Sequence, residues 1–94
     1  MPRLYIRNKP RDLEVEHSVS DNVFYIEGGY LWRHGIDVIR YEYRSYNVCV
    51  VDNGKCWAVQ DMRFMGNKQM RLECIECDDE TIRQYILLAD MIID

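Results

Sequence analysis

The sequence predicts an α+β fold, in which an antiparallel sheet of five to six strands carries one C-terminal helix packed on a face. Three observations lead to this prediction: an Asn-Gly pair between two apolar segments, a stretch of strict polar–apolar alternation, and a final segment with apolar residues at helical spacing. A chain of 94 residues is long enough to bury one core, so we expect a single domain spanning residues 1–94.

The segment from Val48 to Val59 predicts the centre of the sheet. Its Asn53-Gly54 pair favours a type I′ turn, because that turn needs positive φ at both central residues. The expected opposite pairs are then Asp52 with Lys55, Val51 with Cys56, Val50 with Trp57, and Cys49 with Ala58. Both faces of this hairpin are apolar, so we expect both to be covered.

Other segments have the pattern of strands. They are Leu4–Ile6, Asp12–Ser20 with Leu13, Val15, His17 and Val19 facing inward, Val23–Glu27, Tyr30–Arg33, Met62–Met65, Gln69–Glu76, and Ile36–Val51, which is too long for one regular strand and leads into the central hairpin. The pattern predicts turns at Asp21-Asn22 and Gly28-Gly29, and a bulge near residues 45–47. A three-residue loop at 66–68 would set Phe64 opposite Met70 and Met62 opposite Leu72.

The C-terminal segment predicts a helix with Asp78 as its N-cap. The expected buried stripe contains Ile82, Tyr85, Ile86, Ala89, Ile92 and Ile93, with Leu88 at its edge. Leu87 and Met91 project onto the outer, polar side, four residues apart. Such a pair suits contact with a partner or a second copy in a homodimer, although single exposed apolar residues are common on protein surfaces.

The net charge and the hydropathy pattern limit the kinds of partner and compartment that we expect for this protein. A net charge of −4 disfavours non-specific binding to nucleic acid or to an anionic membrane. The sequence shows neither an apolar run of membrane-spanning length nor the apolar segment of a signal peptide near its start. We therefore expect a cytoplasmic protein with reduced cysteines.

The four cysteines are Cys49, Cys56, Cys74 and Cys77, and they are the candidates for a zinc or thiol site. Cys74 and Cys77 lie three residues apart, so on a regular strand they point to opposite faces. Cys49 and Cys56 are diagonal neighbours across the predicted hairpin, about 7–8 Å apart, too far for a disulfide. We therefore interpret all four as small core residues and expect no metal and no cofactor.

A tract rich in tyrosine and arginine suggests a binding surface. Its candidate partner-binding residues are Tyr30, Trp32, Arg33, Arg40, Tyr41, Tyr43 and Arg44. Aromatic rings interleaved with guanidinium groups suit stacking on single-stranded bases, and they equally suit the hot spots of protein interfaces. An amphipathic sheet face without a binding role is a further interpretation, and the acidic net charge favours the protein partner.

Asp12, Glu14 and Glu16 form a row of carboxylates along the exposed side of a predicted strand. One interpretation is edge protection, because charges on an edge strand prevent further strands from adding. The other is a negative strip that binds a basic cleft of a partner, in the place that nucleic acid would occupy.

No spacing of residues indicates a catalytic site or a phosphate-binding loop, so we expect no enzymatic activity. The function that these features favour is a small acidic protein-binding module. We expect a stoichiometric inhibitor or modulator of a larger machine, with nucleic-acid-processing machines as one candidate class, in the manner of phage anti-defence proteins, antitoxins and immunity proteins. The alternatives are a single-stranded nucleic-acid binder that uses the Trp32–Tyr46 surface and a cysteine-based zinc or thiol protein.

Overall fold

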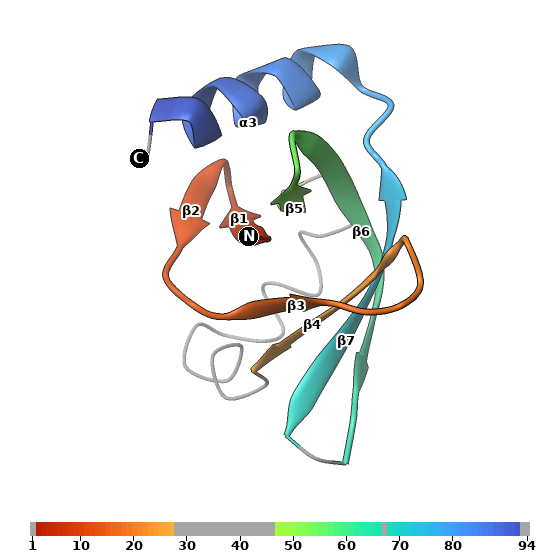
Figure 1. Ribbon diagram of the computed structural model, residues 1–94. Coiled ribbons are helices and arrows are strands. Elements are labelled where there is room, and N and C mark those ends of the chain that lie inside the picture. Colours follow the sequence, from red (N-terminus) through yellow and green to blue (C-terminus); the bar gives the residue numbers. More distant parts are fainter. Residues whose placement is uncertain (1, 28–46, 67, 93–94) are drawn as a thin grey trace.

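A computed structural model describes residues 2–27, 47–66 and 68–92. Over these residues the chain forms a seven-stranded antiparallel sheet that curls into a half-barrel, with a C-terminal helix across its outer face (Figure 1). The strands are β1 (Arg3–Ile6), β2 (Lys9–Arg11), β3 (Val15–His17), β4 (Val23–Glu27), β5 (Val48–Asp52), β6 (Lys55–Phe64) and β7 (Gln69–Glu76), and the helix is α3 (Glu80–Ile92). The strand order is β2-β1-β5-β6-β7-β4-β3.

The predicted α+β class is confirmed, but the predicted number of five to six strands is too low. The strand missing from the prediction is β2, which pairs with β1 so that Ile6 lies opposite Lys9. Arg7 and Asn8 form the two-residue turn between them with φ angles of 52° and 63°. Because Arg-Asn is a less common pair than Asn-Gly in such turns, the sequence signal was weak. Pro10 is tolerated because β2 is an edge strand.

The central hairpin is confirmed in register and position. Cys49 lies opposite Ala58, and Asp52 lies opposite Lys55. The turn residues Asn53 and Gly54 have φ angles of 51° and 77°, as a type I′ turn requires. β5 and β6 are the third and fourth strands of the seven, so the hairpin occupies the middle of the sheet.

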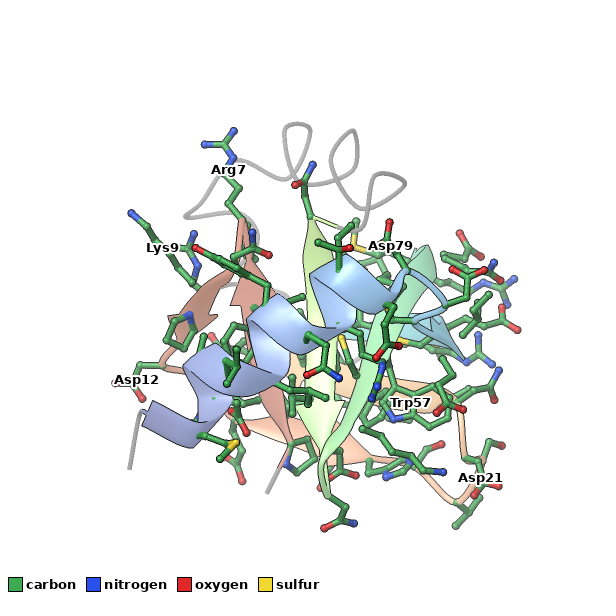
Figure 2. The ribbon with its side chains drawn as sticks, turned by 90° about the horizontal axis from the view of Figure 1, so that it is seen from above. Arg7, Lys9, Asp12, Asp21, Trp57 and Asp79 are labelled. Carbon is green, nitrogen blue, oxygen red and sulfur yellow. The ribbon has the colours of Figure 1, made fainter. Side chains whose placement is uncertain are left out.

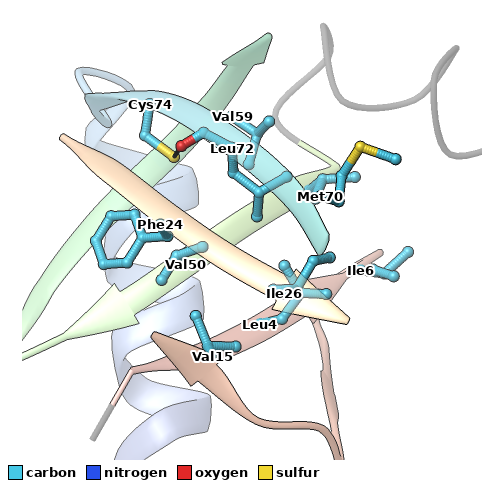
Figure 3. Close-up of a cluster of buried hydrophobic side chains, with 11 residues drawn as sticks. Leu4, Ile6, Val15, Phe24, Ile26, Val50, Val59, Met70, Leu72 and Cys74 are labelled. Atoms are coloured by element: carbon cyan, nitrogen blue, oxygen red, sulfur yellow. Dashed lines mark hydrogen bonds between the residues drawn. The ribbon is translucent and has the colours of Figure 1, made fainter. Parts of the chain in front are cut away.

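The two faces of the sheet bury two separate apolar clusters. The inner cluster fills the concave side of the half-barrel, where side chains from β1, β3, β4, β5, β6 and β7 meet (Figure 3). Its members are Leu4, Ile6, Val15, Phe24, Ile26, Val48, Val50, Val59, Met70, Leu72 and Cys74. The outer cluster lies between α3 and the convex side of β1, β5 and β6, and consists of Tyr5, Cys49, Val51, Cys56, Ala58, Cys77 and Ile86.

The first predicted alternating strand is shorter than expected. Only Val15–His17 forms β3, and Val19 is fully exposed instead of facing the core. The chain leaves the strand at Ser18, whose hydroxyl accepts a hydrogen bond from the Ser20 amide at 3.1 Å. A side-chain hydrogen bond of this kind competes with strand pairing, so the alternation continues in sequence after the strand has ended.

The β6–β7 hairpin has the predicted register at its tip. Phe64 lies opposite Met70, and Met62 lies opposite Leu72. A register shift between Val59 and Asp61 interrupts the ladder further along. Because such a bulge exchanges the two faces of a strand, it keeps both Val59 and Met62 on the inner cluster.

The helix begins one residue later than predicted, and its buried side contains the predicted Ile82, Ile86 and Ala89 but is shifted toward Leu87. The Asp79 carboxylate accepts a hydrogen bond from the Ile82 amide at 3.1 Å, so Asp79, and not Asp78, is the N-cap. Leu87 is partly buried against the outer cluster, so its predicted exposure is wrong. Tyr85, expected in the buried stripe, is 61% exposed.

Several predicted features lie outside the described residues. These are the Gly28-Gly29 turn, the strand at Tyr30–Arg33, the bulge near residues 45–47, and the contribution of Ile93 to the helix stripe. Within the described ranges, no helix has the length and apolar character needed to cross a membrane.

Candidate functional site: an acidic groove beside β3, β4 and β7

The outer face of the sheet is divided between the helix and a groove. α3 lies over β1, β5 and β6, and the other part of the face is formed by β3, β4 and β7 (Figure 1). Beside these strands lies an open groove with a volume of about 360 Å³. Its lining residues are Glu14, Glu16, Tyr25, Ile26, Glu27, Lys68 and Gln69.

Strand pairing explains how these side chains come together. In the β3–β4 pair, Glu16 lies opposite Tyr25. Their neighbours along the strands belong to the inner cluster, so Glu16 and Tyr25 face outward. In the β4–β7 pair, Glu27 lies opposite Gln69. Two successive antiparallel pairings therefore place residues from three separate segments around one groove.

The groove carries a negative charge. Among the described residues, the carboxylates of Glu14, Glu16 and Glu27 line it, together with the ammonium group of Lys68. Glu14 and Glu16 are exposed, and neither forms an ion pair or a side-chain hydrogen bond with any residue in the described part of the chain. Their charges therefore remain available to an incoming cation.

Tyr25 adds an aromatic surface to these charges. It is half-buried on β4, opposite Glu16 on one side and Arg71 on the other. The face of a tyrosine ring attracts ammonium and guanidinium groups, and carboxylates bind the same groups through charge-assisted hydrogen bonds. The residues of the groove are therefore suited to receive a lysine or arginine side chain.

The groove contains two of the three residues in the predicted acidic row. Glu14 and Glu16 line it, whereas Asp12 does not and lies on the side of the molecule that carries Lys9 and Arg7 (Figure 2). The sequence did not indicate Tyr25 or Glu27 as site residues. The pattern of Val23–Glu27 predicted the strand, but nothing in it identified β3 and β7 as its neighbours.

The other predicted partner-binding residues are not part of this groove. Tyr30, Trp32, Arg33, Arg40, Tyr41, Tyr43 and Arg44 all lie outside the described residues, so their binding role stays a prediction. The predicted pair on the helix is not a continuous exposed surface. Met91 is 74% exposed, whereas Leu87 packs against the outer cluster. The exposed apolar residues of α3 are Tyr85, Leu88 and Met91.

His17 forms a second polar arrangement at the end of the inner cluster. Its Nδ1 lies 2.7 Å from Oδ2 of the buried Asp52, and its Nε2 lies 2.8 Å from the Asp21 carbonyl oxygen. The ring also stacks on Phe24 with a centroid distance of 4.3 Å. His17 faces inward as predicted, but its side chain is 32% exposed and lies at the rim of the core.

This arrangement joins distant parts of the sheet. His17 belongs to the edge strand β3, and Asp52 belongs to the central strand β5, with three strands between them in the sheet order. Their contact therefore crosses the open side of the half-barrel. Both ring nitrogens are engaged, so His17 has a structural role in holding β3 against the central hairpin.

The four cysteines are buried, as predicted, and none forms a disulfide. Cys74 belongs to the inner cluster, where burial raises the pKa of its thiol to about 12. Cys77 belongs to the outer cluster, so this pair does point to opposite faces. Among the described residues, no group of three or more histidines, cysteines, aspartates or glutamates is arranged to hold a metal ion.

The fold and the groove together define a small α+β protein with an acidic, tyrosine-containing groove on a curled sheet. Comparisons with protein-family models, with curated proteins and with solved structures found no match to this chain.

Proposed function

We propose that this protein is a non-catalytic protein-binding module whose acidic groove receives a basic segment of a partner protein. The observation that carries this proposal is the gathering of the Glu14, Glu16 and Glu27 carboxylates around a groove that also contains Tyr25. Glu14 and Glu16 repel each other electrostatically, and a cation between them relieves that repulsion.

The chemistry of the groove favours arginine over other side chains. A guanidinium group can bind a carboxylate through two parallel hydrogen bonds, and its plane can stack on an aromatic ring. Tyrosine is also one of the residues that contribute most to binding at protein interfaces. An arginine seated on Tyr25 would lie within reach of the carboxylates that line the groove.

The partner class that we propose is a nucleic-acid-processing protein. Such proteins carry basic clefts that bind phosphate groups, mainly through lysine and arginine. Negative side chains placed along an edge strand and its neighbour present a comparable charge to such a cleft. The protein would then act as a stoichiometric inhibitor or modulator, in the manner of phage anti-defence proteins, antitoxins and immunity proteins.

Affinity capture with matched charge variants tests this proposal. The wild type, the double variant Glu14→Gln/Glu16→Gln and the control Asp12→Asn would be used as baits in lysate of the source organism, with and without nuclease treatment. We expect a protein captured by the wild type and by Asp12→Asn, lost with the double variant, and retained after nuclease. Asp12→Asn removes one charge from an exposed residue outside the groove, so it shows whether the loss of a carboxylate elsewhere on the surface is enough to lower capture.

Binding of the purified partner then tests the mechanism. In calorimetric titrations the affinity should fall as the salt concentration rises. Dissolved ions screen the attraction between exposed charges, and at physiological ionic strength the screening length is about 8 Å. Single-stranded or duplex nucleic acid should compete with this protein for the partner. Equal capture by all three baits, or a captured partner whose nucleic-acid binding is unaffected, would contradict the proposal.

A further inference from the structure

Three cysteine thiols gather beneath the helix. Cys49, Cys56 and Cys77 belong to the outer cluster together with Ile86 of α3. The neighbouring Cys49 thiol and burial raise the pKa of the Cys56 thiol, whereas the neighbouring Cys77 thiol lowers it. Neither the groove nor the proposed partner binding uses these residues.

Cys56 and Cys77 are opposite residues on neighbouring chain segments. Trp57 lies opposite Glu76 at the end of the β6–β7 ladder, and the same register continued by one residue places Cys56 opposite Cys77. The Cys77 amide donates a hydrogen bond to the Cys56 carbonyl oxygen at 2.9 Å, which confirms this alignment. In a hydrogen-bonded antiparallel pair the Cα atoms are about 5.5 Å apart, within the ~4.4–6.8 Å range of disulfides.

The other cysteines are less well placed. Cys49 lies opposite Ala58, and Val51 lies opposite Cys56, so Cys49 and Cys56 are diagonal neighbours. Diagonal Cα atoms are about 7–8 Å apart, beyond the usual disulfide range. Cys74 belongs to the inner cluster, on the opposite face of the sheet. Geometry therefore selects one pair among the four cysteines.

We propose that Cys56 and Cys77 form a reversible disulfide when the protein reacts with a low-molecular-weight disulfide such as oxidised glutathione. The Cys77 thiolate attacks one sulfur of that disulfide, which forms a mixed disulfide and releases one glutathione thiolate. The Cys56 thiolate then attacks the Cys77 sulfur and releases the second. The two protein thiols lose two electrons and two protons, and the reagent is reduced to two molecules of glutathione.

Cys77 is the attacking residue because of its position. It follows the last residue of β7 and lies two residues before Asp79, the N-cap of α3, in a segment without regular structure. Its Sγ donates to the Asp79 carbonyl oxygen at 3.7 Å. Burial raises the pKa of the Cys77 thiol, so the reaction requires a local opening of this segment and proceeds slowly.

The disulfide would tie β6 to the segment that leads into α3. Opposite Cβ atoms in an antiparallel pair are about 4.5–5.5 Å apart, whereas relaxed disulfides hold them at ~3.5–4.5 Å. The bond would therefore be strained, and strained disulfides are readily reduced by thiols. This makes the modification reversible.

The test is disulfide mapping on the folded protein. Wild-type protein with native circular dichroism would be incubated with oxidised glutathione, quenched with N-ethylmaleimide in denaturant, digested and analysed by mass spectrometry without reduction. We expect one internal disulfide linking the peptides of Cys56 and Cys77, a loss of two hydrogens, and alkylation of Cys49 and Cys74. Dithiothreitol should restore four alkylated thiols.

Two cysteine variants test which residues form the disulfide. Cys77→Ser should abolish the internal disulfide, whereas Cys74→Ser, a buried cysteine on the opposite face, should retain it. Mapping of the wild type does not depend on either variant folding. Four alkylated thiols after oxidation, a linkage that includes Cys49 or Cys74, or a disulfide that forms only in denaturant would each overturn the proposal.

Discussion

The Tyr5 hydroxyl donates a hydrogen bond to Asp90 Oδ1 at 2.6 Å, which joins the first strand to the last turns of the helix. Arg3 contacts the same oxygen through Nη1 at 3.2 Å. Burial raises the pKa of the Tyr5 hydroxyl to about 12, and the hydrogen bond to Asp90 adds to this effect. The contact turns the Asp90 side of α3 toward the sheet, and it explains why Leu87 is partly buried and Tyr85 is exposed.

Removing the Tyr5 hydroxyl should destabilise the protein. Hydrogen bonds to charged groups contribute about 1.5–3 kcal/mol, so we expect Tyr5→Phe to lower the free energy of unfolding by about 2 kcal/mol in urea titrations. Tyr85→Phe removes the same hydroxyl from an exposed tyrosine of α3 and is the matched control. Equal effects of the two substitutions would show that the Asp90 contact contributes nothing specific.

The same contact predicts a pH dependence. The pKa of Tyr5 is raised in the folded state from an ordinary value of 10.0 to about 12, so the folded state holds this proton more tightly. The resulting stability, on the order of 2 kcal/mol, is fully present below pH ~10 and is lost as pH rises through ~12. The stability difference between wild type and Tyr5→Phe should therefore vanish over this range. A constant difference from neutral pH to above the folded pKa would contradict the shift.

Two adjacent leucines of the helix should respond differently to a charge. Leu87 packs against the outer cluster, whereas Leu88 is 56% exposed. Burying an unpaired carboxylate is costly, so we expect Leu87→Glu to lower the free energy of unfolding by about 2 kcal/mol, and Leu88→Glu by less than about 0.5 kcal/mol. Thermal unfolding followed by circular dichroism measures both. A more destabilising effect at Leu88 would mean that the helix buries its other side.

The contact between His17 and Asp52 should contribute to closure of the half-barrel. His17→Ala leaves the Asp52 carboxylate, whose side chain is 8% exposed, without its imidazole partner. We expect a loss of about 2 kcal/mol in unfolding free energy, because a buried charge loses its compensating hydrogen bond.

A double-mutant cycle isolates that contact. Asp52→Asn removes the charge, so His17→Ala should cost less in that background than in the wild type. Glu16→Ala changes the residue of β3 that precedes His17. Its side chain faces outward, so this variant controls for changes to the edge strand itself. If the effects of His17→Ala and Asp52→Asn on the free energy of unfolding simply add, His17 and Asp52 are not coupled.

Local signals predicted the parts of the fold that depend on neighbours in sequence. Asn53-Gly54 determined the turn, and the turn determined the register of β5 on β6. The apolar pairs that a three-residue loop sets opposite each other, Phe64 with Met70 and Met62 with Leu72, indicated the β6–β7 register in the same way. The Arg7-Asn8 turn was missed because two residues with side chains adopt positive φ there, which occurs less often than with glycine.

The candidate site was only partly predictable, because it combines residues of one segment with residues from strands distant in sequence. Alternation placed Glu14 and Glu16 on an exposed side, but the groove also needs Tyr25 on β4 and Gln69 on β7. Pairing between strands distant in sequence depends on the curl of the whole sheet, and no short pattern encodes it.

The sequence by itself therefore determined the α+β class, the β5–β6 hairpin with its register, the β6–β7 register near its tip and the apolar character of both faces of the central hairpin, because turn geometry and side-chain alternation are local. Only the tertiary structure decided the seven-strand order, the orientation of α3 and the assembly of the groove. The physical reason is that these depend on contacts between remote segments, such as Tyr5 with Asp90 and His17 with Asp52, whose energy appears only when the chain is folded.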